Sequence, residues 1–294
     1  MADKQRASSI AASLVVVLVG ALVAWAGSQG GVTVGSVPVF ALIVSYAFVV
    51  QWLAFVPSYL GQSERYYDLA GSFTYISGIV LAVVLSRATD ARSIMLLVLV
   101  LVWAGRLGPF LFRRVRRAGK DDRFDEIKRS FSRLLMTWTL QGLWVSLTLA
   151  AALASVTSTE PKGLDVFAFV GLAVWAIGFG LEAVADLQKS RFRADPANKG
   201  SFISSGLWAI SRHPNYFGEI TLWFGIAIIA LPVLQGWQYA TLISPVFVYL
   251  LITRVSGVPL LERKADATWG GQEAYEAYKR RTPVLVPFLG RKQR

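Results

Sequence analysis

Eight long apolar runs recur along the chain, and they restrict its fold more than any other feature of the sequence. About 20 helical residues cross a hydrocarbon core of about 30 Å. The runs lie at 9–27, 38–60, 69–86, 93–112, 133–155, 165–184, 217–232 and 238–253. Inside lipid, only helices and closed barrels satisfy every backbone hydrogen bond. Runs of this length therefore predict an all-α polytopic membrane protein with seven to eight transmembrane helices, of which eight are favoured.

The first run decides between seven helices and eight. It follows Lys4 and Arg6 and ends near AWA at 24–26, a pattern that secretory signal peptides share. We expect it to persist as a membrane helix, and without it the count falls to seven. The last two runs are short, and LPVLQGWQ between them predicts a helical hairpin.

Positive charge is unevenly distributed between the connecting segments. Charged residues make up 16% of the chain, against about 25% in an ordinary soluble domain, and the net charge is +12. Residues 113–133 alone contain nine Lys or Arg, whereas 28–37 and 233–237 contain none. Because basic loops stay in the cytoplasm, we expect the basic loops and both termini there. Anionic membrane lipids account for this basic face without nucleic acid, and the face would also attract an anionic cofactor.

Two residue types that carry much enzyme chemistry are nearly missing. The chain has no cysteine, and His213 is its one histidine. This excludes disulfides, thiol nucleophiles and metal sites built from thiolates or histidine clusters, so we predict no metal site. Ser211 and His213 lie two residues apart in one turn and lack the geometry of a catalytic dyad.

Ionisable residues at the ends of the apolar runs mark candidate functional positions, because charge inside a membrane is costly. Except for Arg106, which lies about two turns inward, they cluster near the ends that we place in the cytoplasm. Snorkelling and local ion pairing explain any one of them, whereas the set as a whole predicts a polar cavity open to the cytoplasm. The set comprises Asp68, Arg106, Glu182, Asp186, Glu219 and Arg254.

The segment LEAVADLQKSRFRADPANKG, at 181–200, has a charged stripe at helical spacing. Glu182, Asp186, Lys189 and Arg193 follow one another at i, i+4, i+7 and i+11, which places them on one helix face. One interpretation is a ladder of salt bridges worth a few tenths of a kcal/mol per pair. The other is a ligand whose hydroxyl groups lie deep and whose phosphates lie outside, since Lys and Arg both bind phosphate.

The segment SSGLWAISRHPNYFGEI, at 204–220, contains the start of a predicted helix. Pro214 suits the first turn, which places His213 near the N-cap and Asn215 and Glu219 one turn apart. An amide and a carboxylate together supply donors and acceptors, which suits a carboxamide ligand. A capping or packing role is the alternative for His213. No dinucleotide fingerprint accompanies these residues, because the glycine-rich GSQGGVTVGS only links two apolar runs and follows no strand.

The segment QSERYYDLAGSFTYI, at 62–76, places Asp68 beside several tyrosines at the start of the third apolar run. Tyrosines at this depth also form an ordinary interfacial belt. A carboxyl group at the mouth of an apolar cavity would nevertheless suit proton donation to a substrate carbonyl.

The combination of GLWAISRHPNYFGE, QKSRFR and EAYEAYKRRTPVLVPF resembles the C-terminal half of membrane steroid 5α-reductases and of sterol C14/C7 reductases, most closely the bacterial branch of the former. The similarity is strong over 180–290 and weaker over 65–130, where it rests on YYDLAGS, WAGRLGPFLFRR and GKDDRFD. Residues 1–64 match no motif of the family. We therefore expect one membrane domain over 1–294, with a cofactor-binding region at 180–290 and substrate-side helices and a basic loop at 65–130. RHPNY alone is also similar to isoprenylcysteine and phospholipid methyltransferases.

The resemblance implies NADPH as hydride donor and a 3-oxo-Δ4 steroid or similar enone as substrate. It implies a cofactor site made of Arg117, Asp186, Lys189, Arg193, Trp208, Arg212, His213, Asn215, Tyr216, Glu219, Arg254, Glu262 and Tyr278. The substrate would lie near Tyr67, Asp68, Trp103 and Arg106, with Asp68 and Tyr67 as candidate catalytic proton donors. Tyr67 and Asp68 replace the family's Gln-Glu pair, and Trp103 stands where a tyrosine aligns.

The chemistry agrees with these residue types, because hydride attack on an enone places negative charge on the ketone oxygen, which a carboxyl or phenol group stabilises. Two other classes remain open: a methyltransferase that uses S-adenosylmethionine, and a lipid-binding or transport protein without catalysis. The oligomeric state is also open.

Overall fold

The computed structural model describes residues 2–118 and 124–289. It is 78% helical, and its one small sheet pairs β1 (Thr33–Val34) with β2 (Val37–Pro38) in antiparallel register. In the described part of the chain, eight helical spans are long and apolar enough to cross a membrane. The prediction of an all-α polytopic membrane protein with eight spans is confirmed. The spans are Lys4–Gly27, Val39–Leu60, Tyr67–Ser86, Ala91–Arg116, Phe131–Val156, Val166–Ala194, Pro214–Val233 and Gly236–Trp269.

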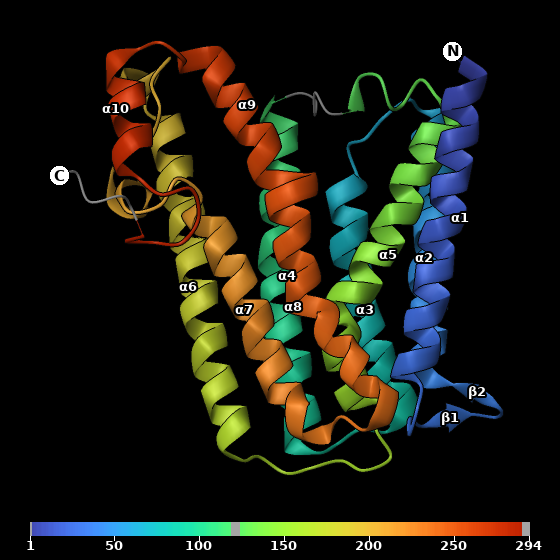
Figure 1. The fold of residues 1–294 in the computed structure, drawn as a ribbon. Coiled ribbons are helices and arrows are strands. Elements are labelled where there is room, and N and C mark those ends of the chain that lie inside the picture. The colour runs from blue at the N-terminus through green and yellow to red at the C-terminus, as the bar shows by residue number, and fades with distance from the viewer. Residues whose placement is uncertain (1, 119–123, 290–294) are drawn as a thin grey trace. The chain divides into compact units, whose positions relative to one another are not determined.

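The chain divides into two compact units. Their helices and strands are labelled in Figure 1. The first comprises Met1–Ala168 and Ile229–Ser244, and the second comprises Phe169–Ile228 and Pro245–Arg294. Each unit therefore combines segments that are distant in sequence.

Helix α5 forms the core of the first unit. The unit contains α1 (Ala2–Gly27), α2 (Val39–Leu60), α3 (Tyr67–Ser86), α4 (Ala91–Ala118) and α5 (Phe131–Val156), followed later in the chain by the short 3₁₀ helices η4 (Leu231–Val233) and η5 (Gly236–Leu242). Helix α5 packs against α1, α2 and α3, and 89% of its most apolar window is buried. A helix that is apolar on all sides belongs in a protein interior, which explains this central place.

Polar side chains join the helices of the first unit across their buried faces. The amide of Gln51 on α2 donates to the Thr74 hydroxyl of α3 over 2.7 Å. The amide of Gln141 on α5 donates to the Tyr67 carbonyl over 3.0 Å. Such bonds hold membrane helices in register, because lipid offers a polar group no alternative partner.

Arg92, near the start of α4, has a fully buried side chain whose donors all find acceptors within the first unit. Its guanidinium donates to the backbone carbonyls of Lys162, Gly163 and Ile229. It also lies 2.9 Å from the Asp165 carboxylate. Arg92 therefore fixes the 162–165 segment and the Ile229 backbone to α4. We counted it only as a loop residue from the sequence.

The second unit is built from long α6 (Val166–Ala194), α7 (Pro214–Ala230), α8 (Ile243–Leu250), α9 (Gly257–Trp269) and α10 (Glu273–Arg281). Between α8 and α9 the chain forms a π-helix, η6 (Leu251–Val255). The apolar runs predicted at 165–184 and 238–253 both continue further as helix than hydropathy alone indicated, since their polar ends remain helical. All four residues of the charged stripe at 182–193 therefore lie on the single helix α6.

Glycines bring α6 and α7 into backbone contact. A Cβ atom at Gly218 of α7 would lie 2.5 Å from the backbone nitrogen of Glu182 on α6. A Cβ atom at Gly225 would lie 2.6 Å from the backbone nitrogen of Trp175. Small residues permit such close crossings of membrane helices, and this one brings the acidic turn of α6 against the start of α7.

Candidate functional site

The candidate site lies in the second unit, where the polar end of α6 meets the first turn of α7. Glu182 and Asp186 on α6 are both buried, and the Asn215 amide of α7 donates to an Asp186 carboxylate oxygen over 3.2 Å. Buried carboxylates in a membrane helix mark functional positions, because their burial opposes stability. The structure thus brings together an acid and an amide that lie 29 residues apart in sequence.

Trp208 connects three elements around this site. It lies in the short 3₁₀ helix η3 (Gly206–Ala209), and its indole N–H donates to the Ala185 carbonyl of α6 over 3.1 Å. The Lys189 ammonium lies 4.3 Å from the centre of the Trp208 ring, a cation–π contact. The Tyr278 hydroxyl of α10 donates to the Trp208 carbonyl over 2.7 Å. Burial raises the pKa of Tyr278 to about 12, so this hydroxyl keeps its proton and its bond.

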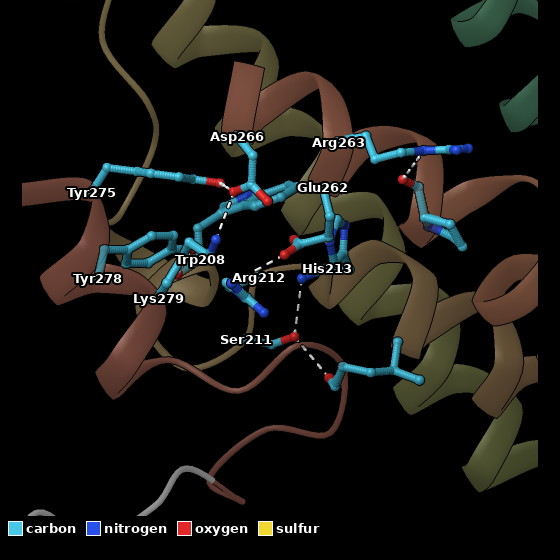
Figure 2. Close-up of polar contacts among 12 residues, drawn as sticks. Trp208, Ser211, Arg212, His213, Glu262, Arg263, Asp266, Tyr275, Tyr278 and Lys279 are labelled. Atoms are coloured by element: carbon cyan, nitrogen blue, oxygen red, sulfur yellow. Dashed lines mark hydrogen bonds and ion pairs between the residues drawn. The ribbon is translucent and has the colours of Figure 1, made fainter. Parts of the chain in front are cut away.

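One carboxylate of α9 holds the segment that precedes α7. Glu262 Oε1 lies 2.7 Å from His213 Nε2, and Glu262 Oε2 lies 3.0 Å from an Arg212 nitrogen (Figure 2). The pKa of His213 is lowered by burial, although the neighbouring Glu262 raises it. The neutral imidazole therefore donates its Nε2–H to Glu262, and the imidazole ring also stacks on Tyr216 with ring centres 5.7 Å apart.

Three buried nitrogen atoms at this junction have no hydrogen-bond partner among the described residues: Nε and Nη1 of Arg212 and Nδ1 of His213. Of these, Nη1 has an ion-pair contact, with Glu262. Buried polar atoms are almost always paired. The Arg212 N–H is a donor and the neutral His213 Nδ1 is an acceptor. A bound molecule that carries both an acceptor and a donor would therefore form hydrogen bonds with the two side chains.

Ser211 has a structural role next to these residues. Its hydroxyl donates to the Leu285 carbonyl over 2.7 Å, and it accepts the backbone N–H of His213 over 3.2 Å (Figure 2). The hydroxyl thus fastens the C-terminal segment beneath the turn before α7. Both of these bonds of the hydroxyl are to backbone groups rather than to the His213 ring.

Asp266 is a residue of this region that the sequence interpretation missed. Its carboxylate accepts from the Tyr275 hydroxyl at 3.1 Å and from the Lys279 ammonium at 2.6 Å, which joins α9 to α10 (Figure 2). Desolvation and this bond to Asp266 raise the pKa of Tyr275. Asp266 lies four residues after Glu262 on α9, so the same helical spacing that marked α6 was available as a signal.

The remaining residues of the predicted cofactor site occupy different environments. Glu219 lies one turn after Asn215 on α7, and both are partly buried. Arg193 and Arg254 are exposed, the latter on the π-helix η6. The side chain of Arg117 lies outside the described residues.

The residues predicted for substrate lie in the first unit. Tyr67 packs edge-on against Phe124 and Trp138, and its hydroxyl donates to the Thr137 carbonyl over 3.2 Å. Asp68 is partly buried in the first turn of α3. Trp103 is buried and contacts the edge of Tyr75. The guanidinium of Arg106 lies 5.7 Å from the centre of the Phe110 ring.

The fold and the site define a multi-pass membrane protein with a polar, partly unsatisfied cluster at the ends of its helices. The family described as "Protein of unknown function (DUF1295)" matches residues 54–282, and the chain belongs to this family.

A further similarity is to a protein of Ustilaginoidea virens named "Probable O-methyltransferase ustE". The two are 28% identical over 119 residues, which is 35% of this chain and 42% of that protein. The chain therefore matches less than half the length of this curated relative. No solved structure matches the chain.

Proposed function

We propose that this protein is a membrane reductase that uses NADPH to reduce the C4–C5 double bond of a 3-oxo-Δ4 steroid or a similar enone. The observation that carries the proposal is the composition of the cluster in the second unit. Cationic side chains, Lys189 and Arg212, stand beside a buried carboxylate–amide pair, Asp186 and Asn215. Phosphates need cations, and a carboxamide needs a donor and an acceptor together.

The residues present fit such a cofactor. The unpartnered Arg212 Nε–H is a buried donor suited to an anionic oxygen. Lys189 and Arg193, on the outer turns of α6, would hold phosphate groups. Asn215 gives one amide proton to Asp186, and its amide oxygen and second proton would bind a nicotinamide carboxamide. NADPH supplies a hydride when bound, and the chain supplies orientation and electrostatics.

Proton donation to the substrate is assigned to Asp68. Reduction of an enone places negative charge on the ketone oxygen, and a nearby proton donor stabilises it. The Tyr67 hydroxyl donates to the Thr137 carbonyl, and Asp68 lies partly buried beside it in the first turn of α3. The two side chains remain the candidate pair on the substrate side.

The direct test is an assay of the purified protein in detergent. We expect NADPH to be oxidised when a panel of 3-oxo-Δ4 steroids is present, and mass spectrometry to detect products that have gained two hydrogen atoms. Protein that neither binds NADPH nor reduces any enone in the panel contradicts the proposal.

A matched pair of variants connects the activity to the site. Lys189→Ala should weaken NADPH binding by at least about tenfold, the equivalent of one charge-assisted hydrogen bond. Lys199→Ala removes the same charge from an exposed position in the same unit and should leave the affinity unchanged. Equal losses in both variants would point to overall charge rather than to a phosphate contact.

The second candidate is a methyltransferase that uses S-adenosylmethionine, favoured by the similarity to the probable O-methyltransferase. That cofactor carries no phosphate, so Lys189→Ala combined with Arg193→Ala should barely change its affinity. Binding of S-adenosylmethionine that survives this double substitution, without NADPH binding by the unsubstituted protein, would favour the methyltransferase. A lipid-binding protein without catalysis would retain its ligand when Asn215 and Glu219 are both substituted.

A further inference from the structure

An apolar groove runs between α2, α3 and α4 of the first unit. It has a volume of about 820 Å³, and its walls include Leu53 of α2, Phe73 of α3 and Gly105 of α4. Ser72, one of the lining residues, marks a close contact between α3 and α4, since a Cβ atom at Gly108 would lie 2.5 Å from its hydroxyl. The groove offers an apolar ligand an extended surface among membrane-spanning helices.

A second, polar pocket lies between the segment that precedes α3 and the last turns of α4. It has a volume of about 360 Å³ and is lined by Ser63, Glu64, Arg65, Val115 and Arg116. Arg65 immediately precedes Tyr66, which lines the groove. Along α4, Arg116 follows the groove residue Pro109 by about two helical turns. The two pockets therefore succeed one another from the membrane span toward its basic end.

Aromatic rings mark the junction between the two pockets. Tyr66 and the Phe112 ring of α4 stack with centres 5.9 Å apart and planes inclined by 18°. Aromatic side chains favour the boundary between hydrocarbon and headgroups. The junction thus corresponds to the depth at which a lipid changes from tail to headgroup.

The polar pocket is positively charged. Glu64 is compensated by Lys128, whose ammonium lies 3.0 Å from its carboxylate. In the described ranges, neither Arg65 nor Arg116 forms an ion pair with a carboxylate. As far as the described residues show, two guanidinium groups therefore face an anion site at this end of the groove without a carboxylate partner.

We infer that the groove and the polar pocket together bind an anionic phospholipid of the bilayer. Its phosphate lies between Arg65 and Arg116, because guanidinium forks suit phosphate oxygens, and an acyl chain follows the α2–α3–α4 groove. A neutral sterol would fill only the groove and leave both arginines without an anion. A soluble anion has no apolar part that would occupy the groove. This site does not depend on the function proposed above.

Native mass spectrometry of the full-length protein tests the inference. The purified protein is incubated with equal amounts of phosphatidylglycerol and phosphatidylcholine, and the retained lipids are counted. We expect a preference of about tenfold for phosphatidylglycerol, equivalent to about 1.4 kcal/mol. Arg65→Ala with Arg116→Ala should abolish this preference, whereas Arg113→Ala with Arg114→Ala, which removes two exposed charges of the same helix outside the pocket, should keep it.

The apolar half of the site has its own variant. A Cβ atom at Gly105 meets nothing within 4 Å, so the side chain in Gly105→Leu enters the groove without disturbing the helix contacts. It should lower the retention of phosphatidylglycerol by several-fold while the thermal unfolding temperature stays unchanged. Equal retention of both lipids by the unsubstituted protein, equal losses in the two arginine pairs, displacement by inorganic phosphate, or equal competition by cholesterol would each overturn the assignment.

Discussion

Arg92 in the first unit and Arg212 in the second are both largely withdrawn from solvent, yet their partners differ. The Arg92 guanidinium meets three backbone carbonyls and the Asp165 carboxylate. The Arg212 guanidinium pairs with Glu262, and its buried Nε–H has no hydrogen-bond partner among the residues that the structure describes. A satisfied buried arginine holds a fold together, whereas an unsatisfied one is available to a ligand, because leaving a buried donor unpaired is costly. Stability and binding measurements should separate the two.

The largest expected effect follows removal of Arg92. Arg92→Ala should lower the free energy of unfolding by about 3–5 kcal/mol, because it leaves a cavity at a fully buried side chain and removes the donor of the buried Ile229 carbonyl. Denaturant titration in detergent measures the loss. Lys162→Ala is the control, because it alters an exposed side chain of the same segment and leaves its carbonyl in place. A loss below about 1 kcal/mol for Arg92→Ala would show that this arginine contributes little to the stability of the fold.

Arg212 should behave in the opposite way. Arg212→Ala should weaken NADPH binding by about 10–150-fold, the equivalent of 1.5–3 kcal/mol for a charge-assisted hydrogen bond, and should affect unfolding much less than Arg92→Ala. Fluorescence titration with NADPH measures the affinity. Arg212→Lys retains the charge without the fork geometry and should restore only part of the affinity. Unchanged NADPH affinity combined with a large loss of stability would make Arg212 another structural arginine.

The glycine contact between α6 and α7 tests how the second unit positions its polar residues. Gly178→Ala should destabilise the protein by about 1–3 kcal/mol, because the added methyl group meets the backbone of Leu222. NADPH affinity should fall as well, since the Asp186–Asn215 pair depends on the same crossing. Gly180→Ala on the same helix meets nothing within 4 Å and should be neutral or stabilising, as alanine favours helix. If both variants gave similar unfolding curves, the close crossing of α6 and α7 would not explain the destabilisation by Gly178→Ala.

The smallest expected effect concerns pH. Burial, together with the nearby Lys189 and Arg212, holds the pKa of His213 below its ordinary value of 6.5 despite Glu262. The unfolded chain therefore binds more protons at this position than the folded chain, and stability falls as pH drops below about 6.5. Unfolding temperatures between pH 5 and pH 8 should decline on acidification, and His213→Gln should flatten the decline. If acidification instead stabilises the protein through His213, then Glu262 holds a charged imidazolium.

Much of the architecture was predictable because membrane insertion imposes a simple rule. Eight apolar runs became eight spans, and the spacing of Glu182, Asp186, Lys189 and Arg193 correctly indicated one helix. Trp208, Arg212 and His213 were also singled out by local motif. Helix ends were less predictable, because polar turns beyond the hydrocarbon core carry no hydropathy signal.

Other features depend on partners that are remote in sequence. Nothing local marks Arg92 as buried, since its partners lie 70 or more residues away. The spacing of Asp266 from Glu262 was a signal in the sequence, but its partners Tyr275 and Lys279 on α10 were found only in the structure. The bond from the Tyr67 hydroxyl to the Thr137 carbonyl likewise joins residues 70 positions apart.

By itself the sequence determined that this chain crosses a membrane with helices, because backbone polar groups without hydrogen bonds are too costly in hydrocarbon. It also determined that the basic residues lie mostly between alternate spans, because charged side chains are costly inside the membrane. Only the tertiary structure decided which polar atoms are satisfied. Satisfaction depends on geometry between distant segments, as in Glu262 with Arg212 and His213. Tertiary packing therefore determines whether a buried arginine stabilises the fold or is available to a ligand.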